Sequence, residues 1–269
     1  MFLKNNKSAL SNAEFVNQEV KDLVDSGCVY EVPFTPYVVN PLSVAINKSI
    51  KKRLILDLSI LNKYVKKERF KFEDWRTALQ MFNKNSFLFK FDLKSGYHHF
   101  DICPQQQTFL GFCWNDKFYC FSVLVFGLSS CPHIFTKCLR TMVKHWRKNA
   151  IDIVLYLDDG FGMASSSELC LQLSNFVKKS LSDAGFLINV EKSIFCPTQQ
   201  LEWLGILWNS NAFSISIPDR RVNDLLQSIN HLINIFPAFS ARLLAHVTAV
   251  FKTGRWSEVD QFCQENTCI

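Results

Sequence analysis

The stretch Ile151-Asp-Ile-Val-Leu-Tyr-Leu-Asp-Asp-Gly160 ends an apolar run with two adjacent carboxylates, Asp158 and Asp159. The segment 153–157 is β-branched and aliphatic, which is typical of a buried strand. Asp159 and Gly160 form a dipeptide that favours a type I′ hairpin turn. A strand that ends in an Asp-Gly turn is common in mixed α/β proteins, so this stretch alone is also compatible with a purely structural turn.

A third carboxylate, Asp92, ends a second apolar strand pattern, Ser86-Phe-Leu-Phe-Lys-Phe-Asp92. If the two strand ends are neighbours, the three carboxylates form an oxygen-lined site for a hard cation such as Mg²⁺, with Mn²⁺ as a substitute. Two such ions about 3.5–4 Å apart stabilise the attacking and leaving oxygens of a phosphoryl displacement. The three carboxylates therefore predict nucleotidyl transfer.

Between these strands, a Gly/Ser turn runs into Pro132, which suits the first turn of a helix. Apolar residues then recur at helical spacing, which predicts an amphipathic helix with one core face. Basic residues lie among them, and two interpretations of these stay open, solvated charges or phosphate contacts. The apolar set is Phe135, Leu139, Met142, Val143 and Trp146, and the basic set is Lys137, Arg140, Lys144 and Arg147.

Three motifs, in order along the chain, resemble those of a reverse transcriptase. Phe91-Asp-Leu-Lys-Ser-Gly-Tyr-His98 resembles the first catalytic motif, Phe126-Gly-Leu-Ser-Ser-Cys-Pro132 the template and nucleotide motif, and Tyr156-Leu-Asp-Asp159 the metal-binding box. The segment 52–62 resembles the fingers, and 189–193 and 201–205 resemble the last palm motifs and the primer grip. The motif combination looks most like the DIRS-type tyrosine-recombinase retrotransposons, with long-terminal-repeat retroelements next.

The resemblance implies an RNA-directed DNA polymerase of a retroelement, which joins a primer 3′-hydroxyl to a deoxynucleoside triphosphate (dNTP) on an RNA or DNA template. It implies that Asp92, Asp158 and Asp159 are the metal ligands. It also implies that Lys192 assists the pyrophosphate leaving group, although a lysine beside Glu191 is equally compatible with a solvated charge.

Four residues match family positions that surround the incoming nucleotide. Arg53 matches the fingers position that contacts the triphosphate, where a guanidinium suits bidentate binding. Tyr97 matches the aromatic sugar gate that crowds a ribose 2′-hydroxyl. Phe126 stands where many retroviral enzymes carry Gln, so its contact with the nucleotide would be apolar or through the backbone. Gly127 lets the template or nucleotide approach the backbone closely. The structural alternatives are a surface charge for Arg53, a packed ring for Tyr97 and an ordinary turn for Gly127.

The histidines and cysteines predict no further metal centre. His98 and His99 have no second His or Cys pair at ligand spacing, so zinc is not expected there. The ten cysteines include no Cys-x-x-Cys pair, and some, such as Cys120 and Cys138, fall in apolar segments. This usage is typical of reduced, small core residues in an intracellular protein.

Composition bounds the class of protein. A chain of 269 residues with 48% hydrophobic residues can bury a large core, in more than one lobe. The net charge of +6 favours a polyanionic partner, here an RNA or DNA template with its primer. There is no signal-peptide pattern, and the longest apolar run, 118–128, is too short to span a bilayer. We therefore expect no membrane contact and an intracellular location, cytoplasmic or nuclear.

The predicted elements indicate an α+β fold. The resemblance implies a right-hand polymerase architecture with fingers, a palm whose antiparallel sheet is backed by helices, and a partial helical thumb. The predicted domains are 1–85 (N-terminal helix and fingers), 86–210 (palm, with fingers elements interleaved) and 211–269 (thumb or connection). Helices are expected at 11–26, 73–83, 167–184, 221–235 and 240–252. Ser11 and Glu14 form a capping-box pattern for the first of these, which should end near Gly27. Strands are expected into Asp92, at 108–124, and in a hairpin at 151–164.

Two further hypotheses stay open. The chain stops before the ribonuclease H and recombinase domains expected of a full-length element, so a truncated copy is expected. Such a copy would be a catalytically inactive remnant that binds nucleic acid. A metal-dependent nuclease is the third hypothesis; it lacks a general-base His at matched spacing, and Arg53 favours polymerisation.

Overall fold

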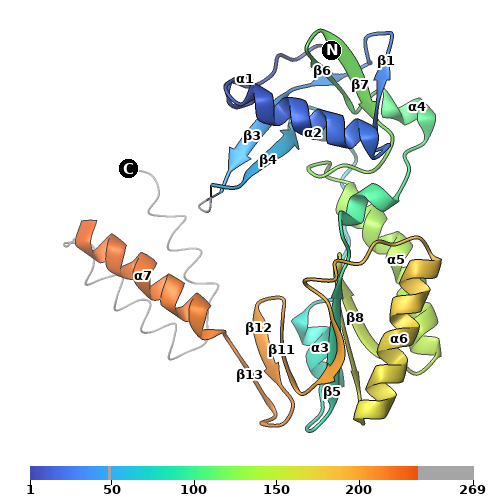
Figure 1. Cartoon of the computed structure of the whole chain (residues 1–269), viewed down its shortest axis with the longest axis vertical. Coiled ribbons are helices and arrows are strands. Elements are labelled where there is room, and N and C mark those ends of the chain that lie inside the picture. Colours follow the sequence, from blue (N-terminus) through green and yellow to red (C-terminus); the bar gives the residue numbers. More distant parts are fainter. Residues whose placement is uncertain (48–49, 236–269) are drawn as a thin grey trace. The chain divides into compact units, whose positions relative to one another are not determined.

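The computed structural model describes residues 1–47 and 50–235 (Figure 1). The chain divides into two compact units, Met1–Leu204 with Trp208–Ser214, and Gly205–Leu207 with the chain from Ile215 onward. The helices are α1 (Lys7–Leu10), α2 (Ala13–Asp25), α3 (Trp75–Met81), α4 (Pro104–Gln107), α5 (Cys131–Lys148), α6 (Ser167–Asp183) and α7 (Asp219–Ile235), with 3₁₀ turns η1 (Leu61–Lys63) and η2 (Gly96–His99). The strands are β1 (Val29–Val32), β2 (Val39–Asn40), β3 (Leu42–Ile46), β4 (Lys52–Leu56), β5 (Phe87–Asp92), β6 (Gly111–Trp114), β7 (Lys117–Phe121), β8 (Asp152–Tyr156), β9 (Asp159–Ala164), β10 (Ile194–Thr198), β11 (Gln200–Trp203), β12 (Ile206–Asn209) and β13 (Ser214–Ser216).

A four-stranded sheet in the order β1-β7-β6-β2 organises the N-terminal part. The β1–β7 and β6–β7 pairs are antiparallel, and β2 joins β6 in parallel. β3 and β4 form a separate antiparallel pair, in register from Leu42 opposite Leu56 to Ile46 opposite Lys52. Helix α2 buries Val16 and Val20 in the same apolar core as these strands, as its amphipathic spacing predicts.

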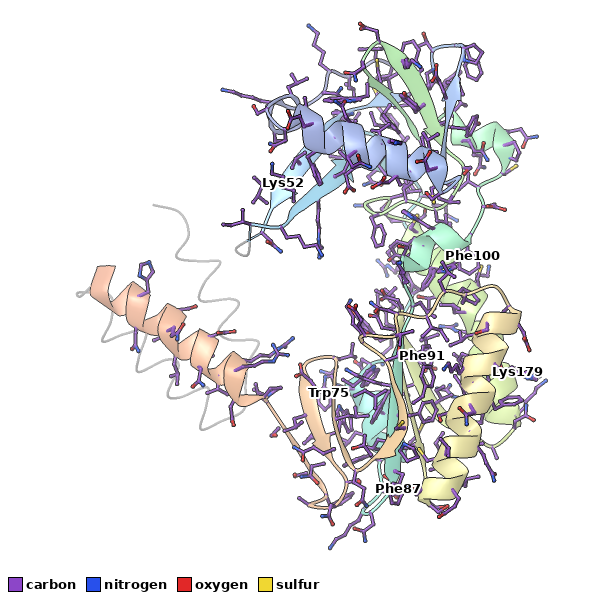
Figure 2. All side chains as sticks on the ribbon, viewed as in Figure 1. Lys52, Trp75, Phe87, Phe91, Phe100 and Lys179 are labelled. Carbon is purple, nitrogen blue, oxygen red and sulfur yellow. The ribbon has the colours of Figure 1, made fainter. Side chains whose placement is uncertain are left out.

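A second four-stranded sheet, β10-β5-β9-β8, is antiparallel throughout and carries the predicted site. Helices α5 and α6 cover one of its faces (Figure 1). Four of the five predicted apolar residues are buried, and Met142 is partly buried against the same core, so the helical spacing was predicted correctly. The buried residues of α5 are Cys131, Phe135, Leu139, Val143 and Trp146. Phe91 of β5, labelled in Figure 2, is buried in this core. Its ring centroid lies 5.9 Å from that of Trp146.

The short segment around η2 joins the two apolar cores. Tyr97 and Phe100 are partly buried and pack against both core clusters, one built on the β1-β7-β6-β2 sheet and the other on the β10-β5-β9-β8 sheet. The rings of Tyr97 and Phe100 lie 5.1 and 5.5 Å from that of Phe135. This segment follows Asp92 directly, so packing on both sides supports the end of β5.

The hairpin turn at the site differs from the predicted one. The turn consists of Leu157 and Asp158, and Asp159 and Gly160 belong to β9, so the predicted Asp-Gly turn is wrong. Gly160 serves packing instead, because a Cβ on it would overlap the ring of Phe91 on the neighbouring strand. Gly162 stands in the same relation to Phe89. The two glycines make room for large aromatic rings of β5 over β9.

Most predicted helices are confirmed, with corrections at their ends. Helix α2 begins after Asn12 and ends before Gly27, whose φ is +74°, as expected for a helix-terminating glycine. The predicted capping box is wrong, because Ser11 ends α1 and does not cap α2. The expected helices at 73–83, 167–184 and 221–235 correspond to α3, α6 and α7. The one at 240–252 lies outside the described residues, and the division into 1–85, 86–210 and 211–269 stays a prediction.

Two remaining expectations concern cysteines and membranes. Cys120 is buried as predicted, but Cys138 is exposed on the outer side of α5, because it falls off the helix's apolar stripe. The cysteines within the described ranges are all free thiols. No helix in the described part of the chain is long and apolar enough to cross a membrane.

Candidate active site

The three predicted carboxylates lie at adjoining strand ends. Asp92 ends β5 and Asp159 begins β9, and the two residues are direct partners across the antiparallel pair. Asp158 occupies the β8–β9 turn, where its carbonyl accepts a hydrogen bond from the Leu93 N–H at 3.0 Å. Asp92 is 8% exposed, and the other two carboxylates are partly buried. The fold therefore gathers three acidic residues that are 66 or 67 positions apart or adjacent in sequence.

Burial and mutual repulsion disfavour the ionised forms of Asp158 and Asp159. Burial raises the pKa of Asp159 to about 6, and the charges of Asp158 and Asp92 add to this rise, while Lys192 and Lys90 oppose it. Burial also raises the pKa of Asp158, with a further contribution from Asp92. Groups of like charge in such a site are stabilised by a bound cation.

The three carboxylates are suitable ligands for Mg²⁺, but their oxygen atoms do not converge on a single coordination site in this structure. Carboxylate oxygens are the ligands that Mg²⁺ and Mn²⁺ prefer, and the site contains no competing soft ligand at these three positions. Within residues 1–47 and 50–235, no three His, Cys, Asp or Glu side chains are close enough together to hold a metal ion as they stand. A cation bound here would be held by Asp92, Asp158 and Asp159 once their side chains turned toward it, and water and phosphate oxygens would supply its other ligands.

The turn that presents Asp158 is strained. Leu157 has a φ of +53°, a left-handed conformation that is unfavourable for a branched side chain. The turn is held by the pairing of Tyr156 with Asp159 on one side and by the Leu93–Asp158 hydrogen bond on the other. Leu157 itself packs against the core beneath the sheet. These contacts offset the strain and keep the two adjacent carboxylates at the tip of the hairpin.

A turn at 189–193 fastens the backbone of Asp92. The Asp92 carbonyl accepts from the Asn189 N–H at 2.8 Å, and the Asp92 N–H donates to Ser193 Oγ at 3.1 Å. The Ser193 hydroxyl in turn donates to the Asn189 carbonyl at 2.7 Å. Lys192 of the same turn brings Nζ to 3.5 Å from Asp92 Oδ2, with 67% of its side chain exposed. Sequence reasoning placed Lys192 at the site but missed Ser193, which no local pattern distinguishes from an ordinary turn serine.

Tyr97 and Phe126 line a pocket of about 110 Å³ next to Asp158. Their ring centroids are 4.7 Å apart. Gly96 lies at the pocket's inner wall, where a Cβ would stand 3.0 Å from the Phe135 ring and 3.3 Å from Asp158 Cβ. Burial raises the pKa of Tyr97 to about 12, and nearby Cys131 and Asp158 contribute, so the phenol stays protonated. Two predicted nucleotide-contacting residues, Tyr97 and Phe126, thus line the same pocket as the predicted metal ligand Asp158.

The other two predicted nucleotide-contacting residues have different surroundings. Gly127 adopts a φ of +92°, and its carbonyl accepts a hydrogen bond from Asn62 Nδ2 at 2.7 Å. Arg53 lies on β4 opposite Ala45, with its side chain exposed. It is not among the residues that line the Tyr97 pocket. The structure therefore places Arg53 on an accessible strand without bringing it into contact with the carboxylates.

His98 and His99 make contacts that support the backbone around Tyr97. The Leu187 N–H donates to His99 Nε2 at 2.9 Å, so His99 Nδ1 carries the proton and donates to the Gly96 carbonyl at 3.0 Å. His98 Nδ1 lies 3.7 Å from Cys28 Sγ. Burial lowers the pKa of His98, so it is neutral at pH 7.

The basic residues of α5 were open to two interpretations, solvated charges or phosphate contacts, and Arg147 has a structural partner instead. Its guanidinium forms a bidentate pair with Glu73, at 2.8 and 2.7 Å, and also donates to the Ile153 carbonyl at 2.7 Å. The residue therefore ties α5 to β8 and to the segment before α3. This is a structural ion pair and not a free charge for phosphate contacts.

The predicted primer-grip segment is a hairpin that packs against strand β9. It consists of β11 and β12, joined by a turn in which Leu204 has a φ of +49°. Trp203 of β11 stacks on Phe161 of β9 at 5.0 Å, and its Nε1 donates to the Asp159 carbonyl at 3.4 Å. The backbone of Asp159 is thus held from this side as well.

Known proteins share this sequence pattern and this arrangement. The family model described as reverse transcriptase (RNA-dependent DNA polymerase) matches residues 38–207, more than half of the chain. The chain is 24% identical over 231 residues to the genome polyprotein of Petunia vein clearing virus (isolate Shepherd), covering 80% of this chain and 10% of the polyprotein. It is 27% identical over 201 residues to the retrovirus-related Pol polyprotein from transposon gypsy of Drosophila melanogaster, covering 72% and 19%. The chain thus spans about a tenth to a fifth of the length of these relatives.

Solved structures share the fold at low sequence identity. A foamy viral protease-reverse transcriptase in complex with dsDNA superposes with a TM-score of 0.72 at 18% identity, over 98% of this chain and 57% of that one. The same kind of protein in complex with an RNA/DNA hybrid gives a TM-score of 0.70 at 18% identity, over 94% of this chain and 34% of that one. These likenesses show a reverse transcriptase polymerase fold. The family match shows that the chain belongs to the reverse transcriptase family, and its relatives are retroelement and viral polyproteins.

Proposed function

We propose that this chain is an RNA-directed DNA polymerase that joins a primer 3′-hydroxyl to a dNTP and releases pyrophosphate. The observation that carries this proposal is the pairing of Asp92 with Asp159 at two strand ends, with Asp158 in the adjoining turn beside the Tyr97 pocket. In this proposal the three carboxylates bind the cations and the neighbouring Tyr97 pocket takes the sugar of the nucleotide. Membership of the reverse transcriptase family supports the reaction class.

In this proposal Asp92, Asp158 and Asp159 hold the Mg²⁺ ions, or Mn²⁺ in their place. When bound, the ions would lower the pKa of the primer hydroxyl and neutralise charge on the transferred phosphate. The protein's own part is to hold the backbone of Asp158 through the Leu93 N–H and that of Asp92 through Ser193. The backbone of Asp159 is held by its pairing with Asp92 across the two strands. Lys192, whose ammonium lies beside Asp92, supplies positive charge toward the pyrophosphate leaving group.

The nucleotide is proposed to lie with its sugar against Tyr97 and Phe126. A ring at Tyr97 leaves little room for a 2′-hydroxyl in a pocket of about 110 Å³, which favours dNTP over ribonucleotide substrates. Phe126 offers an apolar face, and Gly127 lets the substrate approach the backbone. Arg53, on the accessible face of β4, would contact the triphosphate when the nucleotide is bound.

The template is proposed to be RNA or DNA, annealed to a primer. Two solved relatives of the same fold are complexes with dsDNA and with an RNA/DNA hybrid, and the chain's net charge of +6 suits such polyanions. The activity would take place inside the cell, in the cytoplasm or nucleus.

Template choice is tested by extending one labelled DNA primer on matched RNA and DNA templates with Mg²⁺ and dNTPs. We expect extension on both, and loss of both in the Asp158→Asn, Asp159→Asn double variant. A parent protein that is folded and binds the primed template, yet extends neither, would instead favour a nucleic-acid-binding domain without catalysis. Cleavage of the template in the absence of dNTPs would favour a nuclease.

We infer further that the chain derives from a DIRS-type, tyrosine-recombinase element. The supporting feature is the combination of Phe89-Lys-Phe-Asp-Leu-Lys-Ser-Gly-Tyr-His-His99, Phe126-Gly-Leu-Ser-Ser130 and Leu201-Glu-Trp-Leu-Gly-Ile206. The DNA around the coding sequence tests this inference. Reading frames for a ribonuclease H domain and a tyrosine recombinase are expected there, whereas an integrase frame in place of the recombinase would assign the chain to a long-terminal-repeat element.

A further inference from the structure

The loop between β7 and α5 places Phe126 in the wall of the Tyr97 pocket. Phe126 is 56% exposed, yet its ring centroid lies 4.7 Å from that of Tyr97 and 5.8 Å from that of His98. Gly127 follows with a φ of +92°, outside any regular element. A loop of this kind keeps one conformation only if partners elsewhere in the fold bind its backbone groups. The position of Phe126 therefore depends on what holds residues 127–129.

Asn62 binds this loop on both sides of Leu128. Its Nδ2 donates to the Gly127 carbonyl at 2.7 Å, and its Oδ1 accepts from the Ser129 N–H at 2.8 Å. A carboxamide offers a donor and an acceptor side by side, so a single side chain satisfies both groups. Asn62 is itself fixed, since it lies in η1 and its N–H donates to the Leu58 carbonyl at 2.8 Å.

We propose that Asn62 is a positioning residue for sugar discrimination. By binding residues 127–129 it holds Phe126 against Tyr97, and this contact sets the width of the pocket beside Asp158. The inference rests on the proposed function of that pocket as the place of the incoming deoxyribose. Asn62 reaches the substrate only through the loop and through Phe126.

The size of the pocket makes it sensitive to this loop. Phe126 forms part of the wall of this pocket of about 110 Å³, so a shift of its ring changes the room left for a 2′-hydroxyl beside Tyr97. The carboxylates are held by other contacts, from Leu93, Asn189 and Ser193. Loss of Asn62 should therefore change nucleotide selection and nucleotide affinity more than it changes the chemical step.

Three variants separate positioning from general stability. Asn62→Ala removes both hydrogen bonds. Asn62→Asp keeps an acceptor for the Ser129 N–H but sets a carboxylate oxygen against the Gly127 carbonyl. Asn17→Ala is the matched control, because Asn17 Oδ1 also accepts two hydrogen bonds, from Trp114 Nε1 at 2.7 Å and Asn115 Nδ2 at 3.1 Å, away from the 127–129 loop.

The test measures single-nucleotide incorporation from a dNTP and from the matching ribonucleotide on one primed template. For Asn62→Ala we expect about a tenfold higher KM for the dNTP and about a tenfold weaker preference over the ribonucleotide, with kcat for the dNTP nearly unchanged. Asn62→Asp should shift both values in the same direction, and Asn17→Ala should shift neither. An unchanged preference in both Asn62 variants would overturn the proposal, as would an equal change in Asn17→Ala.

Hydrogen exchange of the same proteins separates this inference from the proposed function. If the parent incorporates no nucleotide, the polymerase proposal fails, but the role of Asn62 in the loop is still measured. Peptides covering residues 124–130 should exchange faster in Asn62→Ala than in the parent and in Asn17→Ala. Should Asn62→Ala fail to fold, Asn62→Asp provides the same comparison. Equal exchange in the parent and the folded Asn62 variant would overturn the inference.

Discussion

Replacing Asp159 with Asn should stabilise the metal-free protein at neutral pH. Burial and the neighbouring charges of Asp158 and Asp92 raise the pKa of Asp159 from 3.8 to about 6. The folded state therefore binds this proton more tightly than the unfolded state does. The resulting stability is fully present below about pH 3.8 and is lost as the pH rises through about 6. At pH 7.5 the ionised carboxylate consequently destabilises the fold, and an amide of the same shape removes that cost.

The magnitude follows from the pKa. A rise from 3.8 to about 6 corresponds to roughly 3 kcal/mol, at 1.36 kcal/mol for each pH unit. Asp159 is only partly buried, so solvent screening reduces this to roughly 1–2 kcal/mol. For Asp159→Asn we expect a gain of that size in the free energy of unfolding at pH 7.5. At pH 5 the gain should be about half as large, because the parent carboxyl is then mostly protonated in the folded state but already ionised in the unfolded state.

Urea unfolding of the parent and Asp159→Asn in EDTA, at pH 7.5 and pH 5, measures this difference. Asp152→Asn is the control, because Asp152 is exposed at the far end of β8. It should change the free energy of unfolding by less than about 0.5 kcal/mol. Adding Mg²⁺ at pH 7.5 should stabilise the parent and not the Asp159 variant. A loss of stability in Asp159→Asn at pH 7.5, or equal stabilisation of both proteins by Mg²⁺, would refute the reasoning.

Three further substitutions test other parts of the site. Gly160→Ala should lower the free energy of unfolding by roughly 1–3 kcal/mol in the same urea titration, because the new methyl group overlaps an aromatic ring of β5. Gly185→Ala is the control: position 185 has open space but a φ of +82°, so this substitution should cost about 1 kcal/mol. Equal effects of the two substitutions would contradict the packing argument. Tyr97→Phe should keep the preference for dNTP over ribonucleotide, whereas Tyr97→Ala should lose most of it in competitive incorporation; a strong preference in the alanine variant would exclude the ring as the sugar gate. Ser193→Ala should lower kcat about tenfold and leave the Kd for primed template unchanged, because it removes the hydrogen bond from the Asp92 N–H to Ser193 Oγ. An unaltered kcat would show that this contact is dispensable.

The meeting of the carboxylates was predictable because each one lies at, or next to, the end of a strand with a strong local pattern. Alternating or continuous apolar residues before Asp92 and before Asp158 indicate buried strands, and antiparallel pairing brings such ends together. The exact turn was not predictable in the same way. Asp-Gly favours a turn locally, but the ring of Phe91 requires a glycine at position 160 within the strand. A contact between residues 69 positions apart thus overrides a local preference.

The supporting residues were missed for a related reason. Ser193 and Asn62 are ordinary polar residues in sequence, and their roles arise only from hydrogen bonds to backbone groups of distant segments. In the sequence Arg147 does not differ from the other basic residues of its helix, and its ion pair with Glu73 arises only from the tertiary fold. Periodicity reports which side of an element is buried, but it carries no information about which polar partners meet across the fold.

Primer extension on an RNA template, titrated with Mg²⁺, tests the central claim most directly. The parent and Asp152→Asn should extend the primer only when Mg²⁺ is present. Asp92→Asn, Asp158→Asn and Asp159→Asn should each reduce the rate by at least about a hundredfold while still binding the primed template. Extension by all three variants at the parent's rate, or no extension by a folded parent that binds the primed template, would contradict the assignment of this site to metal-dependent DNA synthesis.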